Sequence, residues 1–511
     1  MISEAEYRKK VLACWYGKNI GGTLGGPYEG FPVVNHLTFY DPVPTGSMPN
    51  DDLELQAMYA AALDRMEKPC VSRETLADIW SKHMKFMCDE YAVAVRNLEM
   101  GLRPPWTGRF DNHFTCGMGA AIRSELWACL APGNPGLAAK FAYEDACIDH
   151  DGAGVDAEVF NAVVESLAFV EPDVRKLTEA GLEYLPADST LAAGIREAIS
   201  LWDETHDWLH CRNVLFEKYA SEAVTDVRIN LPFTVLALLS GNGDFGKTIC
   251  DAVNCGMDTD CTGATAGAIL GILNPDGIPE VWMKPVGKEL VVRTSMIPGL
   301  DFPPTLDAFT DQILSLKKRI PQSVPDSPEI QPDFEKYRIP YEVAFQKNLR
   351  WFFVNLPELK WRKMKTDPIN GSLEVPPEYR GNGGQIVLRF TFELPKDGEY
   401  WIMFNSPSSN QVYLDPDVEQ LHDDRDMLFG RQRLFMDQER ADGMFACCGR
   451  PVVFSPTLGG APMNQIKRYL QLKAGRHTLI AAVEPLCFEA KIRWGLSVGL
   501  RTDLLNSIIY K

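Results

Sequence analysis

The chain has 511 residues, of which 45% are hydrophobic and 23% charged, as is ordinary for a globular protein. Its formal net charge of −18 argues against non-specific nucleic-acid binding and against docking on anionic membranes, because a negative surface repels phosphate groups. At about 100–200 residues per domain, the length allows two to four domains.

The cysteine content and the N-terminus bear on the compartment. The thirteen cysteines are odd in number and have no short regular spacing, which is typical of small buried thiols in a reducing environment. The N-terminal residues lack a basic stretch followed by an apolar segment, so no signal peptide is expected. No apolar run reaches the roughly 18 residues of a membrane helix. We therefore predict a cytoplasmic protein.

The first part of the chain has helical periodicity. From Ser3 to about Leu316, Ala- and Leu-rich stretches alternate with Gly, Pro and Asn, and alternation of strand type is scarce. This pattern predicts an all-α domain over residues 1–318. The clearest expected helices are Asp52–Met66, Arg73–Tyr91, Pro135–Ile148 and Asp156–Phe169.

The composition changes after Arg319. Five prolines fall within about twenty residues and predict an extended linker, which we place at residues 319–344. Beyond it the apolar period becomes two, and several short strands with turn signals indicate a β-sandwich over residues 345–511. The expected strands are Gln385–Leu394, Glu399–Asn405 and two within Tyr469–Val483, joined by a turn at Lys473–Arg476.

Two pairs of carboxylates precede helical segments. Asp51 and Asp52 follow Asn50, and Asp258 and Asp260 precede a helix rich in Gly, Ala and Thr. Capping and the positive end of the helix explain one such pair by itself. Four carboxylates at two buried helix starts would instead repel each other, and a hard cation such as Mg²⁺, Ca²⁺ or Mn²⁺ removes that repulsion.

Three further segments bear candidate site residues. The glycine-rich run 17–30 lacks the preceding strand of a dinucleotide site, and it indicates a tight packing corner that presents Glu29. In the segment 104–125, Gly117 and Gly119 precede a helix whose start could hold an anion. The aromatic residues there could line a pocket or simply anchor a surface loop. His150, next to Asp151, is either a structural hydrogen-bonding residue or part of a site.

These five segments, in their order along the chain, resemble the ADP-ribosylglycohydrolase family over roughly residues 7–310. The most specific piece is NCGMDTDCTGATAGAILG with the preceding LPFTVLALLSGNGDFGKTICDAV. The resemblance implies an all-α domain that usually binds two Mg²⁺ ions. The C-terminal β-rich region lies outside it.

The resemblance also implies roles for individual residues. Metal ligands match at Asn50, Asp51, Asp52, Asp258 and Asp260, and Glu29 matches an acidic residue near the scissile bond. Gly117, Gly119 and His150, with Asp151 beside it, match the ADP-ribose site. The chain departs from the family pattern where Asn50 and Cys261 stand in place of Thr, and where Gly22 stands in place of Asp. A neutral thiol is a poor Mg²⁺ ligand.

We therefore predict a metal-dependent hydrolase that cleaves an N- or O-glycosidic bond at the anomeric carbon of an ADP-ribosyl or related sugar. A water held by Asp52, Asp258 or Asp260 would attack, and Glu29 would serve as acid, base or gate. Ordinary sugar glycosides or nucleoside-like compounds are the alternative substrates, and a non-catalytic binding protein is the alternative class. The expected partners are a small molecule or glycan, or an ADP-ribosylated protein. The sequence is silent on oligomeric state.

The β-rich region carries aromatic residues with two possible roles. They could stack on sugar rings, as in domains appended to glycosidases, or they could form the core of the sandwich. These residues are Trp351, Trp361, Tyr400, Trp401 and Trp494.

Overall fold

A computed structural model of the chain divides into two compact units. The first comprises residues 1–86, 101–109 and 114–329, and the second comprises 87–100, 110–113 and 330–511. The structure describes residues 2–86, 89–110, 112, 114–221, 223–338, 340–346, 359–365, 367, 373–374, 376–379, 385–406, 410–415, 464–483, 491–492, 495–500 and 508–510.

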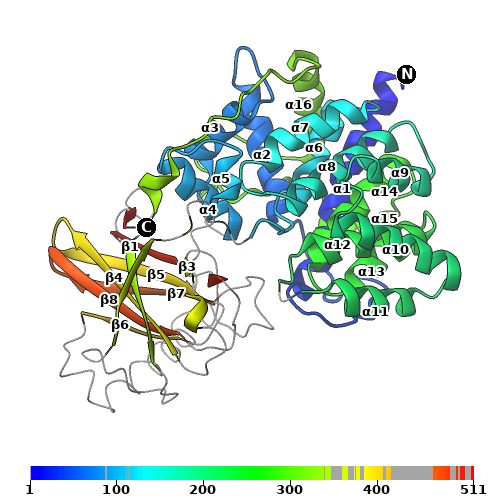
Figure 1. The fold of residues 1–511 in the computed structure, drawn as a ribbon. Coiled ribbons are helices and arrows are strands. Elements are labelled where there is room, and N and C mark those ends of the chain that lie inside the picture. Colours follow the sequence, from blue (N-terminus) through cyan, green and yellow to red (C-terminus); the bar gives the residue numbers. More distant parts are fainter. Residues whose placement is uncertain are drawn as a thin grey trace. The chain divides into compact units, whose positions relative to one another are not determined.

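The first unit is helical throughout (Figure 1). Its α-helices are α1 (Glu4–Gly25), α2 (Asp51–Asp64), α3 (Arg73–His83), α5 (Trp106–Arg109), α6 (Ser124–Leu130), α7 (Pro135–Ala146), α8 (Ala153–Ala168), α9 (Val174–Leu182), α10 (Thr190–Thr205), α11 (Trp208–Tyr219), α12 (Val227–Gly241), α13 (Phe245–Asn254), α14 (Thr259–Leu273), α15 (Glu280–Val286) and α16 (Leu306–Arg319), with the 3-10 turns η1 (Gly26–Tyr28) and η2 (Ala121–Arg123).

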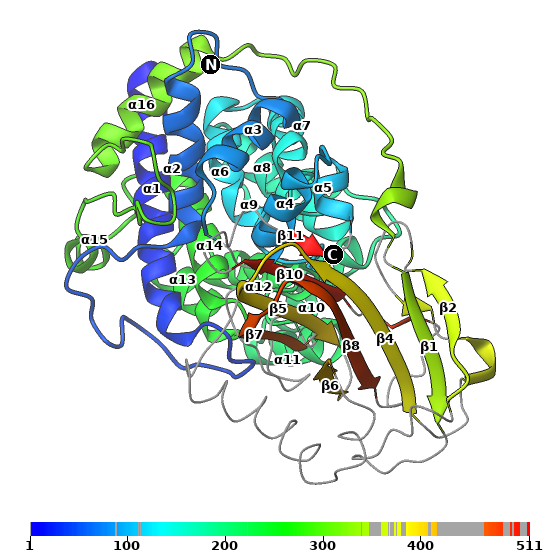
Figure 2. The same cartoon turned by 90° about the vertical axis from the view of Figure 1, so that its left-hand side faces the viewer.

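Helices α1 and α14 cross in backbone contact. A Cβ on Gly17 would lie 2.0 Å from the carbonyl oxygen of Gly267, and a Cβ on Gly271 would lie 2.1 Å from that of Ala13. Only glycine permits this approach, so these glycines place the start of α14 beside the end of α1. Figure 2 shows α1, α2 and α16 side by side in the same unit, where they contact one another.

The expected helices are present with shifted ends, and one was wrong. The stretch Arg73–Tyr91 is two helices, because α3 ends at His83 and α4 (Asp89–Glu99) begins six residues later. Met84, the C-cap residue of α3, has an extended backbone with ψ 110°. The backbone N–H of Lys85 then donates to the carbonyl oxygen of Met296, 2.9 Å away, instead of continuing the helical ladder. Helix α4 belongs to the second unit.

The second unit contains antiparallel strands in three sheets, with strand orders β2-β1-β4-β8-β6, β11-β10-β5-β7 and β3-β9. The strands are β1 (Pro340–Gln346), β2 (Arg362–Lys365), β3 (Leu373–Glu374), β4 (Gln385–Leu394), β5 (Gly398–Ser406), β6 (Asn410–Leu414), β7 (Asn464–Leu472), β8 (Gly475–Val483), β9 (Lys491–Ile492), β10 (Gly495–Leu500) and β11 (Ile508–Tyr510), with the 3-10 turns η3 (Phe334–Tyr337) and η5 (Pro377–Tyr379).

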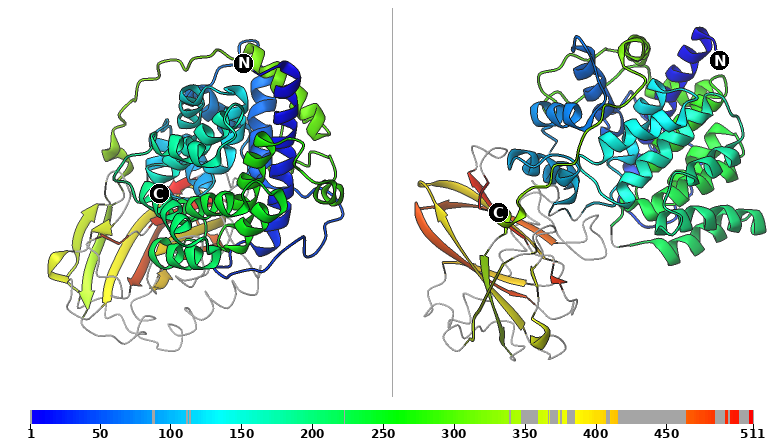
Figure 3. Two further views of the ribbon diagram at one scale, coloured as in Figure 1. Left: turned by 90° about the vertical axis from the view of Figure 1, so that its right-hand side faces the viewer. Right: turned by 45° about the horizontal axis from the view of Figure 1, so that its top comes forward.

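Strand β4 has the expected bounds, and burial alternates along its second half, where Leu388, Phe390, Phe392 and Leu394 are buried. It pairs with β8 from Ile386 opposite Val483 to Leu394 opposite Gly475, and Figure 3 shows these two strands side by side in yellow and orange. Strands β7 and β8 meet at the expected turn, yet they pair with β5 and β4, in different sheets.

The proline-rich segment continues from the end of α16 without a helix until η3. Ile320 is buried, and Ser327 Oγ donates to Glu74 Oε2 at 2.7 Å, so the segment lies along the helical unit up to residue 329. Strand β1 begins at Pro340, inside the range expected to be linker. No helix among the described residues has both the length and the apolar character needed to cross a membrane.

Candidate metal centre and active site

The first carboxylate pair lies at the start of α2. Asn50 caps this helix through its side-chain oxygen, which accepts from the backbone N–H of Asp52 at 2.8 Å. Asp52 is therefore in the first turn, and its side chain is buried, whereas Asp51 is partly exposed. The amide oxygen of Asn50 has a second lone pair, so capping leaves it able to bind a cation.

The second pair lies at the start of α14, which α12 and α1 hold in place. The backbone N–H of Asp258 donates to Asn230 Oδ1 of α12 at 3.2 Å. Thr259 Oγ1 donates to the carbonyl oxygen of Gly25, the last residue of α1, at 2.8 Å. The Asp258 side chain makes no capping hydrogen bond, so its carboxylate is available for another partner.

Glu29 reaches the same place through a short backbone bridge. Gly30 N–H donates to the carbonyl of Met257 at 3.0 Å, and Met257 N–H donates to that of Phe31 at 2.9 Å. Gly256 precedes this bridge with φ +76°, and a Cβ there would lie 2.2 Å from the carbonyl oxygen of Val33. The bridge places the exposed Glu29 beside the buried start of α14.

The structure brings these side chains together in two groups that share Asp260. Ligand atoms of Glu29, Asp258 and Asp260 lie within 4.8 Å of one another. Those of Asp52, Asp260 and Cys261 do the same. Two oxygens on opposite sides of one Mg²⁺ lie about 4.2 Å apart, so either group is close to the span of a single cation.

Burial dominates the electrostatics of this cluster. Loss of solvent around the carboxylate, together with the neighbouring Asp52 and Asp260, raises the pKa of Asp51 to about 8. Burial likewise raises the pKa of Asp52 to about 7, partly opposed by Lys18, and that of Asp260 to about 7, with Glu29 adding to the rise. The pKa of Asp258 is also well above its ordinary range, first through burial and then through Asp260.

The polar atoms of Asp258 are the strongest sign of a missing positive partner. Asp258 is 1% exposed, and neither of its carboxylate oxygens has a hydrogen-bond partner among the described residues. Asp260 Oδ1 is in the same condition. An unpaired buried carboxylate is costly, and a bound cation removes that cost. The donor set thus fits a hard divalent cation.

Sequence analysis missed a buried lysine next to this cluster. Lys18 of α1 places its Nζ 3.3 Å from Asp52 Oδ1 and 2.8 Å from Glu125 Oε1, with all three side chains buried. Burial lowers the pKa of Lys18, but the Glu125 and Asp52 carboxylates raise it by more, so the ammonium stays charged. The available signal was a lysine among the closely spaced glycines of α1, a position that packs against another helix.

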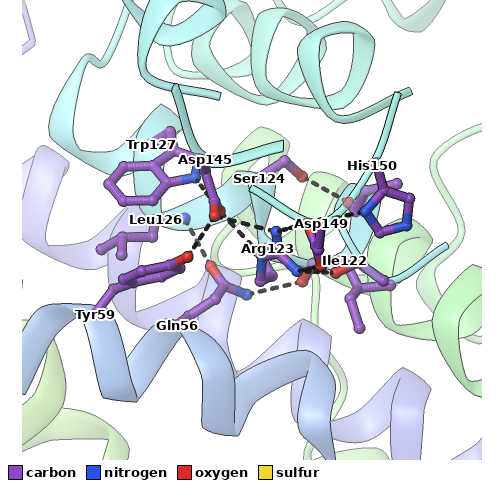
Figure 4. A network of polar contacts seen from close by, with 12 residues as sticks. Gln56, Tyr59, Ile122, Arg123, Ser124, Leu126, Trp127, Asp145, Asp149 and His150 are labelled. Atoms are coloured by element: carbon purple, nitrogen blue, oxygen red, sulfur yellow. Dashed lines mark hydrogen bonds and ion pairs between the residues drawn. The ribbon is translucent and has the colours of Figure 1, made fainter. Parts of the chain in front are cut away.

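Sequence analysis also missed a second buried network of charged residues, which is centred on Arg123. Arg123 donates to Asp149 through Nη1 and Nη2 at 2.9 Å each, and to Asp145 through Nε at 3.0 Å and Nη2 at 3.1 Å (Figure 4). Tyr59 and Trp127 donate to the same Asp145 at 2.6 and 3.0 Å. Arg123 and both aspartates are fully buried, so this network ties α2, α6 and α7 together.

The predicted substrate residues lie around this network. The carbonyl oxygen of Gly119 accepts from Arg123 Nη1 at 2.6 Å, and Gly117 is buried. His150 is fully buried, with Nδ1 3.0 Å from Asp149 Oδ1. Asp151 accepts from Arg109 Nε at 2.9 Å and is partly exposed. The role of these residues in substrate binding stays a prediction.

The aromatic residues that the sequence singled out differ in burial and in whether the structure describes them. Trp106, Phe110 and Phe114 are all buried. Of the aromatic residues of the β-rich region, Tyr400 is buried and donates to the carbonyl of Lys396 at 2.6 Å, while Trp361 lies under the guanidinium of Arg389. Trp401 lies in β5. Trp351 and Trp494 fall outside the described residues.

Comparison with known proteins identifies the family. The model of the ADP-ribosylglycohydrolase family matches residues 3–319, and the chain belongs to this family. Membership implies hydrolysis of a glycosidic bond of an ADP-ribosyl substrate. An uncharacterized protein of Archaeoglobus fulgidus is 26% identical over 295 residues, which are 54% of this chain and 91% of the relative.

Two solved structures show weaker likeness. An ADP-ribosylglycohydrolase-related protein complex is 18% identical, with a TM-score of 0.43, and covers 62% of this chain and 99% of its own. A beta-glucosidase from Kluyveromyces marxianus in complex with glucose is 15% identical, with a TM-score of 0.18, and covers 31% of this chain and 16% of its own.

Proposed function

We propose that the chain is a divalent-cation-dependent hydrolase that cleaves an N- or O-glycosidic bond at the anomeric carbon of an ADP-ribosyl or related sugar substrate. The observation that carries this proposal is the buried Asp258 carboxylate, whose two oxygens have no hydrogen-bond partner among the described residues. Mg²⁺ is the proposed cation, because the cluster is rich in carboxylate oxygens.

The cation would be held by Asp258 and Asp260 with Glu29 at the exposed side, and Asp51, Asp52 and Asn50 lie at the neighbouring helix start. When bound, it supplies positive charge that draws in and orients the sugar hydroxyl groups and the linkage oxygen. Negative carboxylates beside the anomeric carbon stabilise the oxocarbenium character of the transition state.

The residues of the chain would supply the proton transfers. Asp52 and Asp258 would orient a water and accept its proton, since both are buried acids and burial raises the pKa of each above the ordinary carboxyl value. Glu29 is exposed and belongs to the group that includes Asp258. It would act as an acid or base at the leaving group, or as a gate.

Purified full-length protein, incubated with Mg²⁺, tests the reaction. Release of free ADP-ribose from ADP-ribosylated amino acids, peptides and proteins, measured by chromatography, is the expected result. Sugar glycosides and nucleoside-like compounds form the second arm of the panel. If the protein hydrolyses only the sugar glycosides or nucleoside-like compounds, the ADP-ribosyl substrate is wrong and one of these is the substrate class. If a folded protein that binds Mg²⁺ hydrolyses no compound of either arm, the proposed hydrolase activity is contradicted.

Asp258→Asn should abolish turnover, because the amide keeps the size of the side chain but removes its charge. The matched control is Asp188→Asn, which changes an exposed carboxylate outside the cluster and should leave turnover intact. Wild-type turnover in the Asp258 variant would contradict the assigned role. Circular dichroism of both variants verifies that the helical fold is retained.

For the β-rich region we propose a β-sandwich accessory domain that begins with β1 at Pro340 and follows the helical catalytic unit, which extends to residue 329. Two antiparallel sheets of five and four strands support a sandwich. The buried Tyr400 supports a core role for at least one of its aromatic residues. The nine cysteines among the described residues are thiols rather than disulfides, which supports the proposed cytoplasmic location.

A further inference from the structure

The two groups of possible ligands are not equivalent. Both oxygens of Asp52 already have partners: Lys18 Nζ lies 3.3 Å from Oδ1, and Cys261 Sγ lies 3.8 Å from Oδ2. Both oxygens of Asp258, in contrast, have no hydrogen-bond partner among the described residues. Positive charge is therefore supplied by the chain itself at one end of the cluster and is missing at the other.

Lys18 is held firmly in this position. Its Nζ also contacts Glu125 Oε1 at 2.8 Å, and the other carboxylate oxygen of Glu125 accepts from Gln56 Nε2 at 2.8 Å. Gln56 in turn accepts from the backbone N–H of Leu126 at 2.7 Å. The Lys18 ammonium and both carboxylates are buried, so the lysine is held between Asp52 and Glu125 in the core.

We infer that the chain binds one divalent cation, at Glu29, Asp258 and Asp260, and that the Lys18 ammonium occupies the role of a second cation at Asp52. The inference rests on the proposed function only in that both need a cation at Asp258. It specifies that one cation is bound and where it is bound, and it assigns to Lys18 the role of determining both.

Three features oppose an ion at the group Asp52–Asp260–Cys261. An ion there would contact the carboxylate that Lys18 already contacts, and two positive charges at such a distance in a buried site repel strongly. The thiol of Cys261 is a poor ligand for a hard cation. Asp260, the carboxylate shared by both groups, would already be committed to the ion beside Asp258.

A Mn²⁺ titration of the full-length protein tests the count, because Mn²⁺ prefers the same oxygen ligands as Mg²⁺ and is visible by electron paramagnetic resonance. Free Mn²⁺ is measured by its resonance signal, and bound metal is measured after dialysis by elemental analysis. The wild-type chain should bind one ion. Lys18→Met, which removes the ammonium but keeps an unbranched side chain, should bind two ions, with signal broadening from two neighbouring spins.

Lys10→Met is the matched control. Lys10 is a second buried lysine of α1, and its Nζ donates to the carbonyl oxygens of Ile272 and Ala168, away from the cluster. This variant should still bind one ion. Should Lys18→Met fail to fold, Lys18→Met with Glu125→Gln removes the unpaired buried charge and should also bind two.

The outcomes separate the inference from the proposed function. Two ions on the wild-type chain, or one ion on the folded Lys18 variants, would overturn the inference and leave the hydrolase proposal standing. No ion on the wild-type chain would overturn both the cation and the inference. Loss of the single ion in Asp258→Asn is expected, and its retention would show that the ion lies elsewhere.

Discussion

Gly21 of α1 faces Gly263 of α14 so closely that a Cβ on Gly21 would lie 1.9 Å from the Gly263 carbonyl oxygen. Gly21 is in the last turns of α1, and Gly263 is in the first turns of α14. These are the helix ends that carry the site, because Glu29 follows α1 and Asp258 precedes α14. The separation of the two carboxylates therefore depends on how closely these helices approach. The glycines along α14 permit this close approach.

We predict that Gly21→Ala destabilises the protein and weakens the metal site. The added methyl group must displace the backbone of α14, and overpacking of this kind costs about 1–3 kcal/mol or more. Urea unfolding measures the stability, and a Mn²⁺ titration measures the affinity. Gly26→Ala is the control, because a Cβ there meets nothing within 4 Å. Equal stability of the two variants would contradict a tight α1–α14 contact.

We also predict that the metal-free protein loses stability as the pH rises from about 5 to about 8. Burial raises the pKa of Asp52 and Asp260 to about 7 and that of Asp51 to about 8, from an ordinary value of 3.8. These acids thus bind more protons in the folded than in the unfolded chain, and raising the pH favours unfolding. The destabilisation begins near the ordinary value and is complete above about 8.

Thermal unfolding in a chelator, at half-unit steps of pH, measures this slope. Excess Mg²⁺ should flatten it, because the cation stabilises the ionised carboxylates, and the protection by Mg²⁺ should grow with pH. A melting temperature that rises over the same range in chelator would contradict the raised pKa values. Asp258→Asn should raise the melting temperature of the metal-free protein near pH 8.

The sequence was most informative where periodicity and burial coincide. Strand β4 was predicted with its bounds, because the buried Leu388, Phe390, Phe392 and Leu394 alternate with Arg389, Thr391 and Glu393. The helix over Arg73–Tyr91 failed because a long-range hydrogen bond from Lys85 N–H to the Met296 carbonyl ends α3, and no local pattern encodes that contact.

The candidate site shows the same limit. Carboxylates at two helix starts could be predicted to meet, since acidic pairs before Gly- and Ala-rich helices are conspicuous. The partners of those carboxylates could not, because Lys18 and Glu125 are more than a hundred residues apart and meet only in the folded core. Charged residues are usually exposed, so the amino-acid composition does not predict that a particular lysine is buried. Only the packing of the folded chain identifies it.

Replacement of Arg123 by Met should be strongly destabilising. The guanidinium lies between Asp145 and Asp149 with no exposure, and its loss leaves two buried carboxylates without their cation, which costs about 3–5 kcal/mol. Urea unfolding measures the loss. Arg8→Met is the control, because Arg8 pairs with the exposed Asp311 at 2.8 Å, and such pairs contribute about 0–1 kcal/mol. Similar losses in the two variants would contradict the structural role of the network.

Truncation within the proline-rich segment should change the stability of the helical unit. Residues 1–329 should be more stable than residues 1–318, because the longer chain keeps the buried Ile320, the hydrogen bond from Ser327 to Glu74 and the ion pair of Glu329 with Arg109. Thermal unfolding compares the two, and equal melting temperatures would show that the segment 319–329 contributes nothing to the helical unit.

The longer fragment also tests whether the β-rich region takes part in the chemistry. Every predicted metal ligand lies within residues 1–329, so the fragment should bind Mn²⁺ as the full chain does. If the β-rich region only binds substrate, the fragment keeps kcat and raises KM on a large substrate, with both unchanged on a small one. A collapse of kcat on the small substrate, in a fragment that folds and binds metal, would show instead that the β-rich region completes the active site.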